Sequence, residues 1–258
     1  MNRWPILLYL CEMRKNILLL LTSAIILVSC VSIEPDARSI MNQAMIAHGT
    51  DVAAQGILSF DFRGINYSVE RDKGAYIYER HLMIGTDTIV DRLDNDGFYR
   101  YSNGNKLPLV DSIATRYTAS LNSVIYFAQL PYSLDGDAID LRYVSQDTIK
   151  GKAYHEIEVT FKEEGGGEDH EDVFMYWVNV KDSRIDYLAY SYCEEECGYR
   201  FRESENRRNL NGVILQDYNN YKSQKGDPDL SKMDDLFEEG KLLKLSDIDS
   251  KRAIFEKK

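Results

Sequence analysis

Residues 154–162 alternate between apolar and polar side chains, and this period of two, within the segment 154–192, is the feature that most constrains the fold. Residues 174–178 are apolar throughout, as expected of a strand that is covered on both faces. The segment 154–192 divides into three predicted strands, 154–162, 173–180 and 184–192, joined by a glycine-rich acidic loop and a short turn. Strands joined by such short connections run antiparallel. Since segments on both sides alternate in the same way, the sequence predicts a mainly β (α+β) protein, with a curved antiparallel sheet or half-open β barrel.

The flanking segments supply the rest of the predicted elements. Turn residues such as Arg63-Gly64 and Asp94-Asn95-Asp96-Gly97 separate the alternating runs. Further strands are expected at 57–62, 65–70, 75–80, 88–93, 98–101, 139–143, 199–202 and 213–221. Helical spacing predicts a helix over 36–48, with Asp36 as its N-cap and Gly49 ending it. A short buried helix or lid is expected over 120–130, stopped by Pro131.

The N-terminus has the pattern of a secretion signal. Basic residues after Met13 precede an apolar run of 12 residues, 17–28, which is shorter than the roughly 20 residues a spanning helix needs. Leu27-Val28-Ser29-Cys30 resembles the lipobox of bacterial lipoproteins, in which the cysteine becomes acylated. We therefore expect translation to start at Met13, a signal peptide within 1–29, lipidation of Cys30 and a tether over 30–35.

The remaining chain is expected to form one β domain over 36–225, followed by a C-terminal helix and surface tail over 226–258. A net charge of −11 and the lack of a basic patch argue against nucleic acid as a partner. After export and lipidation, Cys193 and Cys197 are the two remaining cysteines. An oxidising compartment favours a disulfide between them, and two free thiols are the alternative.

The loop from Gly165 to Asp172 is the candidate metal site. Its three glycines allow unusual backbone angles, and Glu168, Asp169, His170 and Asp172 offer ligands to a divalent cation. A solvated hairpin loop without metal is the alternative, and we predict no obligatory cofactor.

Other polar residues have simple structural interpretations. His155 lies on an apolar strand face, typical of a hydrogen-bonded core histidine. His48 ends the first helix, where a positive charge is favoured. Arginines follow aromatic residues in Tyr199-Arg200-Phe201-Arg202, and Arg207 and Arg208 come soon after. A solvated outer face is the preferred interpretation, and an anionic headgroup site is the alternative.

The blocks around Asp96-Gly97-Phe98-Tyr99-Arg100, residues 148–154 and Asp186-Tyr187-Leu188 resemble the lipoprotein-carrier (LolA-like) superfamily. That resemblance implies a half-open barrel covered by helices, whose concave apolar face binds acyl chains. Residues 122–128, 165–170 and 200–202 resemble more closely a family of Gram-negative bacterial lipoproteins that brings no known activity.

We therefore predict a protein, attached to the membrane by its N-terminal lipid, that binds a lipid or other apolar ligand without catalysis. The expected location is the cell envelope, at the outer membrane facing the periplasm. The alternatives are a metal-dependent hydrolase or lyase using the 165–172 loop, and an envelope scaffold with a filled barrel. The sequence predicts no particular oligomeric state. The expected ligand-contacting residues share apolar faces: Phe60, Phe62, Tyr67, Val124, Phe127, His155, Ile157, Val159 and Phe161.

Overall fold

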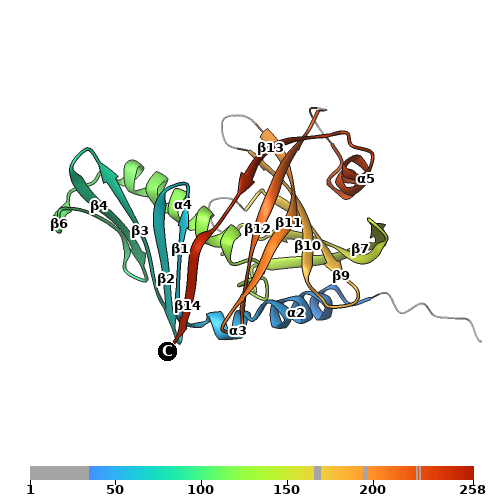
Figure 1. Ribbon diagram of the computed structural model, residues 1–258, viewed down its shortest axis with the longest axis horizontal. Coiled ribbons are helices and arrows are strands. Elements are labelled where there is room, and N and C mark those ends of the chain that lie inside the picture. The colour runs from blue at the N-terminus through green and yellow to red at the C-terminus, as the bar shows by residue number, and fades with distance from the viewer. Residues whose placement is uncertain (1–34, 166–169, 194–196, 225, 227) are drawn as a thin grey trace, which may run out of the picture. The chain divides into compact units, whose positions relative to one another are not determined.

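The alternating segments fold into two antiparallel sheets of seven strands each (Figure 1). This computed structural model describes residues 35–165, 170–193, 197–224, 226 and 228–258. The predicted mainly β, antiparallel fold is confirmed, and its strands form two sheets rather than one. The predicted signal peptide, the lipobox and nearly all of the tether lie outside the described residues.

Sheet 1 contains the early strands of the chain and, at one edge, the last strand. Each strand from β1 to β6 pairs with the next through a short turn, so neighbours in sequence are neighbours in space. In order across the sheet, the strands are β14 (Lys251–Lys257), β1 (Gln55–Phe62), β2 (Ile65–Asp72), β3 (Ala75–Ile84), β4 (Asp87–Asp94), β5 (Gly97–Ser102) and β6 (Asn105–Leu107).

Sheet 2 contains the central meander that dominates the sequence pattern. In order across the sheet, its strands are β13 (Leu242–Ile248), β12 (Val213–Ser223), β11 (Cys197–Leu210), β10 (Ile185–Cys193), β9 (Val173–Asn179), β8 (Lys152–Phe161) and β7 (Ile139–Ile149). Strand β9 is buried on both faces, as its continuous apolar sequence predicts, because other elements cover both sides of this sheet.

The predicted C-terminal surface tail is wrong. Residues 242–257 instead form β13 and β14, which add one edge strand to each sheet, and residues Asp36–Lys258 belong to one compact unit. Edge strands carry little apolar signal, because most of their side chains face solvent. In β14, for example, Phe255 is buried while the adjacent Ile254 is 59% exposed.

Helix α2 (Ala37–His48) begins and ends at the predicted residues. The Asp36 carboxylate accepts hydrogen bonds from the backbone N–H groups of Arg38 and Ser39, both at 3.2 Å. Gly49 ends the helix with a φ of 71°, and a Cβ there would lie 1.9 Å from the carbonyl oxygen of Gly212. Glycine is therefore required both by the backbone angle and by the close approach of the β11–β12 turn. The short helix α3 (Thr50–Ala53) follows.

Helix α4 (Asp111–Ala128) is longer than the predicted 120–130 helix and contacts both sheets (Figure 1). Near its start, Tyr117 lies 6.0 Å from Phe98 of sheet 1, between ring centroids. Near its end, Tyr126 and Phe127 pack edge-to-face or tilted on Phe174 of sheet 2. The apolar pattern does not predict the first turns of α4, because Ser, Thr and Arg residues occupy them.

Three hydrophobic clusters account for the core. One joins α2 to one face of sheet 2, one joins sheet 1 to α3 and α4, and one lies on the other face of sheet 2. The third is covered by the 3₁₀ helix η2 (Leu230–Lys232) and by α5 (Met233–Glu238), which lie where a C-terminal helix is predicted within 226–258. No helix in the described part of the chain is long and apolar enough to cross a membrane.

Candidate functional site

A cavity of about 230 Å³ lies between sheet 1 and sheet 2, beside α4. At roughly 30 Å³ for each water-sized group, it has room for about eight such groups. Strand β1 contributes Phe60 and Phe62, which alternate onto the same face. Helix α4 contributes Val124, Phe127 and Ala128, whose spacing of three and four places them on one side of the helix.

Four of the nine predicted ligand-contacting residues line this cavity: Phe60, Phe62, Val124 and Phe127. Tyr67, Ile157 and Val159 are fully buried in the core instead. Phe161 packs at the edge of the cluster on sheet 2, and the His155 ring lies 5.9 Å from that of Tyr143. Alternation identifies the inward face of each strand, but it does not show which part of that face is filled by neighbouring side chains.

Arg202 is the polar centre of the cavity wall. It lies on β11, where alternation places Phe201 toward α5 and Arg202 toward sheet 1. The residue is only 8% exposed, and its guanidinium carbon lies 3.8 Å from the centroid of the Phe127 ring. The preferred prediction of a solvated outer face is therefore wrong for Arg202. Alternation with buried Phe201 places Arg202 on the opposite face, but it does not show that α4 covers that face.

An Nη atom of Arg202 donates a hydrogen bond to the hydroxyl of Tyr190 at 2.7 Å. Among the described residues, the buried Nε–H of Arg202 has no hydrogen-bond partner, and neither has the buried side-chain oxygen of Asn220. Arg202 and Asn220 are directly opposite each other in the β11–β12 pairing, and both line the cavity. Nearby, burial raises the pKa of the Tyr218 hydroxyl.

The cavity wall is positively charged. It includes two arginines, Arg202 inside and the exposed Arg63 at the rim, and no acidic residue. In a chain of net charge −11, this local excess of positive charge is unusual. A site with an apolar wall and buried hydrogen-bond donors suits a molecule that is apolar along most of its length and anionic at one end.

Two other hollows have a different character. One of about 700 Å³ lies among β11, β12 and the β13–β14 connection and is lined mostly by charged and amide side chains, including Glu205, Arg208 and Asp247. Another of about 330 Å³ is bordered by Arg71, Tyr76, Tyr78 and Tyr132. In the second, Arg71 is already engaged by Gln129 and Tyr78 at 2.5 and 2.7 Å. We therefore take the smaller inter-sheet cavity as the candidate site.

The predicted metal site in the acidic loop is described only in part. Glu168 and Asp169 lie outside the described residues, whereas His170 and Asp172 precede β9. Neither His170 nor Asp172 belongs to the cluster of acidic side chains that could hold a metal ion in the described structure. That cluster consists of Asp147, Glu156 and Asp234, with one carboxylate oxygen from each lying within 4.8 Å of the others.

This carboxylate cluster was missed because alternation on β8 places Glu156 away from the main core. The opposite face is covered by α5, so Glu156 and Asp234 are both 2% exposed. The indole Nε1 of Trp177 donates to Glu156 at 2.8 Å and to Asp234 at 3.2 Å. Burial, with Glu156 as the next cause, raises the pKa of Asp234 to about 7. The three carboxylates offer the oxygen ligands that a hard cation prefers. A proton on Asp234 would equally relieve the repulsion between its carboxylate and that of Glu156.

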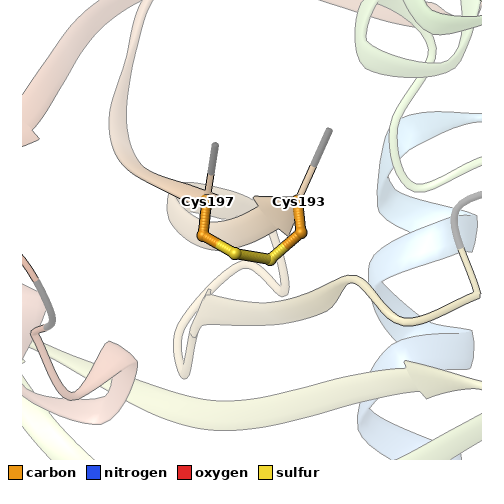
Figure 2. The surroundings of a disulfide bond; sticks show 2 residues. All are labelled: Cys193 and Cys197. Carbon is orange, nitrogen blue, oxygen red and sulfur yellow. A yellow bond between two sulfur atoms is a disulfide. The ribbon is translucent and has the colours of Figure 1, made fainter. Parts of the chain in front are cut away.

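Cys193 and Cys197 form a disulfide that joins the end of β10 to the start of β11 (Figure 2). The two residues are directly opposite each other in the β10–β11 pairing. The bond therefore closes the hairpin five positions along β11 from Arg202, at the far end of the strand from the β11–β12 turn.

Several solved structures resemble the chain. A LolA superfamily protein from Nitrosomonas europaea is 10% identical with a TM-score of 0.43, covering 74% of this chain and 88% of that chain. A putative outer membrane lipoprotein-sorting protein domain from Vibrio parahaemolyticus is 6% identical with a TM-score of 0.43, covering 86% and 94%. The lipoprotein LppX from Mycobacterium tuberculosis is 10% identical with a TM-score of 0.27, covering 60% and 87%. Scores of this size carry no argument about function.

Comparison by sequence gives a clearer result than comparison by structure. No curated protein matches it. A family model described as a family of unknown function, DUF6503, matches residues 14–250, which is most of the chain. The match spans sheet 2, all of sheet 1 except β14, helix α4 and every residue that lines the cavity. The chain therefore belongs to the DUF6503 family.

Proposed function

We propose that this protein binds a lipid or another apolar ligand in the inter-sheet cavity, without carrying out chemistry on it. The observation that supports this most directly is the cavity's lining of Phe60, Phe62, Val124 and Phe127. The proposal includes lipidation of Cys30 and a location in the cell envelope at the outer membrane, on the pattern of residues 13–30.

The size of the cavity limits how tightly an apolar chain alone can bind. Eight methylene groups at about 0.8 kcal/mol each would contribute about 6 kcal/mol on transfer from water. Association entropy opposes this by at least ~4 kcal/mol. A short chain bound by apolar contact alone would therefore bind weakly, and a longer chain would extend past the rim at Arg63.

Native mass spectrometry tests the proposal on a soluble form that begins at Val31. This form keeps the whole unit Asp36–Lys258, which contains every described helix and strand and all three hydrophobic clusters. Purified from a periplasm without detergent, it should carry a bound mass in the lipid range that is released on denaturation. A clean mass of the protein alone, with no uptake of added short-chain lipids, would contradict the proposal.

A variant that fills the cavity provides the matched comparison. Val124→Trp should abolish the bound mass, because the larger side chain occupies the cavity next to Phe127. Val110→Trp is the control, since Val110 lies just before α4 and is 62% exposed. Both variants should retain the circular dichroism of the parent. Retention of the bound mass in a folded Val124→Trp would show that the ligand is bound elsewhere.

A further inference from the structure

Arg202 is buried without a countercharge in the described structure. A guanidinium 8% exposed normally pairs with a carboxylate, because burying an unpaired charge is unfavourable. Among the residues the structure describes, every ion pair involves other side chains, such as Arg80 with Asp91 and Arg208 with Asp217. Arg202 therefore resembles a binding residue whose anion is supplied from outside the chain.

The surroundings of the guanidinium support this. Its central carbon lies over the ring of Phe127, and its N–H groups are the groups able to bind a ligand. Tyr190 accepts from one Nη atom, and the Nε–H has no partner. An arginine has five N–H donors in a planar fork that matches a carboxylate or phosphate. Arg202 lines the cavity, as does Asn220, which is opposite it in the strand pairing.

We infer that the cavity takes an amphiphile with an anionic head, a carboxylate or a phosphate monoester, and that Arg202 binds this head. The chain of the amphiphile would lie against Phe60, Phe62 and Val124. This inference rests on the proposed function, because it assigns a ligand class to the same cavity. The exposed Arg63 at the rim adds a second positive charge near the entrance.

A purely structural role for Arg202 predicts something different. If the guanidinium served only to join α4 to β11 through Phe127, the cavity would show no preference between charged and neutral ligands of equal chain length. Its wall would also have no reason to combine two arginines with no acid in a chain of net charge −11. The two roles therefore differ in a measurable property, which is head-group selectivity.

Isothermal titration calorimetry of the soluble form beginning at Val31 makes this comparison. The ligands are nonanoate, octyl phosphate and 1-octanol, which share an eight-carbon alkyl chain and differ in the head. The unmodified protein should bind at least one of the two anions tenfold or more tightly than 1-octanol, and the stronger of the two identifies the head. Weak 1-octanol binding should be unaffected by salt, whereas anion binding should weaken as salt is raised.

Two variants assign the selectivity to one side chain. Arg202→Met removes the charge and keeps most of the volume, so it should bind all three ligands about as weakly as 1-octanol. Arg200→Met is the control: Arg200 lies on the same strand but contacts Tyr192 and does not line the cavity. It should retain the tenfold selectivity. Persistence of the selectivity in a folded Arg202→Met would overturn the assignment.

The comparison in the unmodified protein is decisive even if Arg202→Met does not fold. Equal affinity for nonanoate, octyl phosphate and 1-octanol would overturn the inference and leave the proposed function standing. No measurable binding of any of the three would contradict the proposed function and the inference together. Selectivity for an anion in the unmodified protein, lost on filling the cavity with Val124→Trp, would support both.

Discussion

The guanidinium carbon of Arg202 lies over the ring of Phe127, 3.8 Å from the ring centroid. Strand β11 of sheet 2 is thereby joined to α4, which also packs on sheet 1. The contact is therefore both part of the cavity wall and part of the connection between the sheets.

This contact should be measurable as a coupling energy. Phe127→Leu should lower the free energy of unfolding by about 2 kcal/mol, because it removes the stack on Arg202 and the contacts with Phe174 and Tyr190. A double-mutant cycle with Arg202→Met should give a coupling of about 1 kcal/mol in urea unfolding. The same cycle with Arg200→Met should give no coupling, and a coupling of equal size there would contradict the assignment.

His48 should make the protein less stable in mild acid. Its Nε2 accepts a hydrogen bond from the backbone N–H of Ile185 at 3.1 Å, so the ring is neutral, contrary to the positive charge predicted from its place at the end of α2. Burial, followed by Arg207 and Arg184, lowers the pKa of His48 from 6.5 to about 3. Since the unfolded chain then binds the proton more readily, stability falls as pH drops from 6.5 toward 3.

Urea unfolding of His48→Gln at pH 7.5 and pH 5 tests this. At pH 5 the histidine should lower the stability of the parent by about 2 kcal/mol relative to pH 7.5. Glutamine can still accept from Ile185 and does not titrate, so the variant should lack this part of the pH dependence. His81→Gln is the control, because the His81 side chain is 41% exposed on β3. Parallel pH profiles for the parent and His48→Gln would rule out this origin of acid sensitivity.

Asp234 should have the opposite effect on the pH dependence. The pKa of Asp234 is raised to about 7 in the folded protein, compared with about 3.8 in the unfolded chain. The neutral carboxyl of Asp234 therefore contributes fully to stability below pH 3.8, and this contribution is lost as pH rises through about 7. Asp234→Asn keeps an acceptor for Trp177 and removes the charge beside Glu156. The variant should therefore be more stable than the parent at pH 8, on the order of 3 kcal/mol, and about equal at pH 4.

Thermal unfolding at the two pH values measures this difference. Asp235→Asn is the matched control, since the Asp235 side chain is 57% exposed and should change stability by less than about 0.5 kcal/mol. If Asp234→Asn were less stable than the parent at pH 8, the charged carboxylate would be the stabilising form. That result would instead favour a cation bound among Asp147, Glu156 and Asp234.

The last strand should be essential for stability. Phe255 of β14 is 1% exposed and packs in the cluster between sheet 1 and α4, whereas Ile254 faces solvent. Phe255→Ala should lower the free energy of unfolding by about 3–4 kcal/mol. Ile254→Ala, one residue away, should change it by less than about 0.5 kcal/mol. Similar small effects in urea unfolding would show that β14 is not packed as described.

The sequence predicts local structure well here and long-range structure poorly. Asp36 and Gly49 mark the ends of α2 because a side-chain cap and a left-handed backbone angle are local requirements. The hairpins of sheet 1 follow from turns such as Arg63-Gly64 for the same reason. Strands β13 and β14 were missed because their partners, β12 and β1, are set by pairing across the fold and not by the local sequence of either strand.

The candidate site shows the same limit. Alternation correctly places Phe60 and Phe62 on an inward face, but the cavity exists only where β1, α4 and β11 to β13 meet. Glu156 and Arg202 both occupy faces that look polar in sequence and are buried in the fold. Each was misassigned because a strand in sequence does not show that a second layer covers it, by α5 in one case and by α4 in the other.

The pairing of β1 with β14 also has a consequence for the order of folding. Gly56 is opposite Lys257, so two segments about 200 residues apart must meet before sheet 1 is complete. Contacts of such long sequence separation form slowly, because a long loop must close first. A chain emerging N-terminus first can form the hairpins β1 to β6 early, yet that sheet keeps an open edge until its final residues arrive. Until β14 pairs with it, the edge of β1 is therefore open to pairing with other strands.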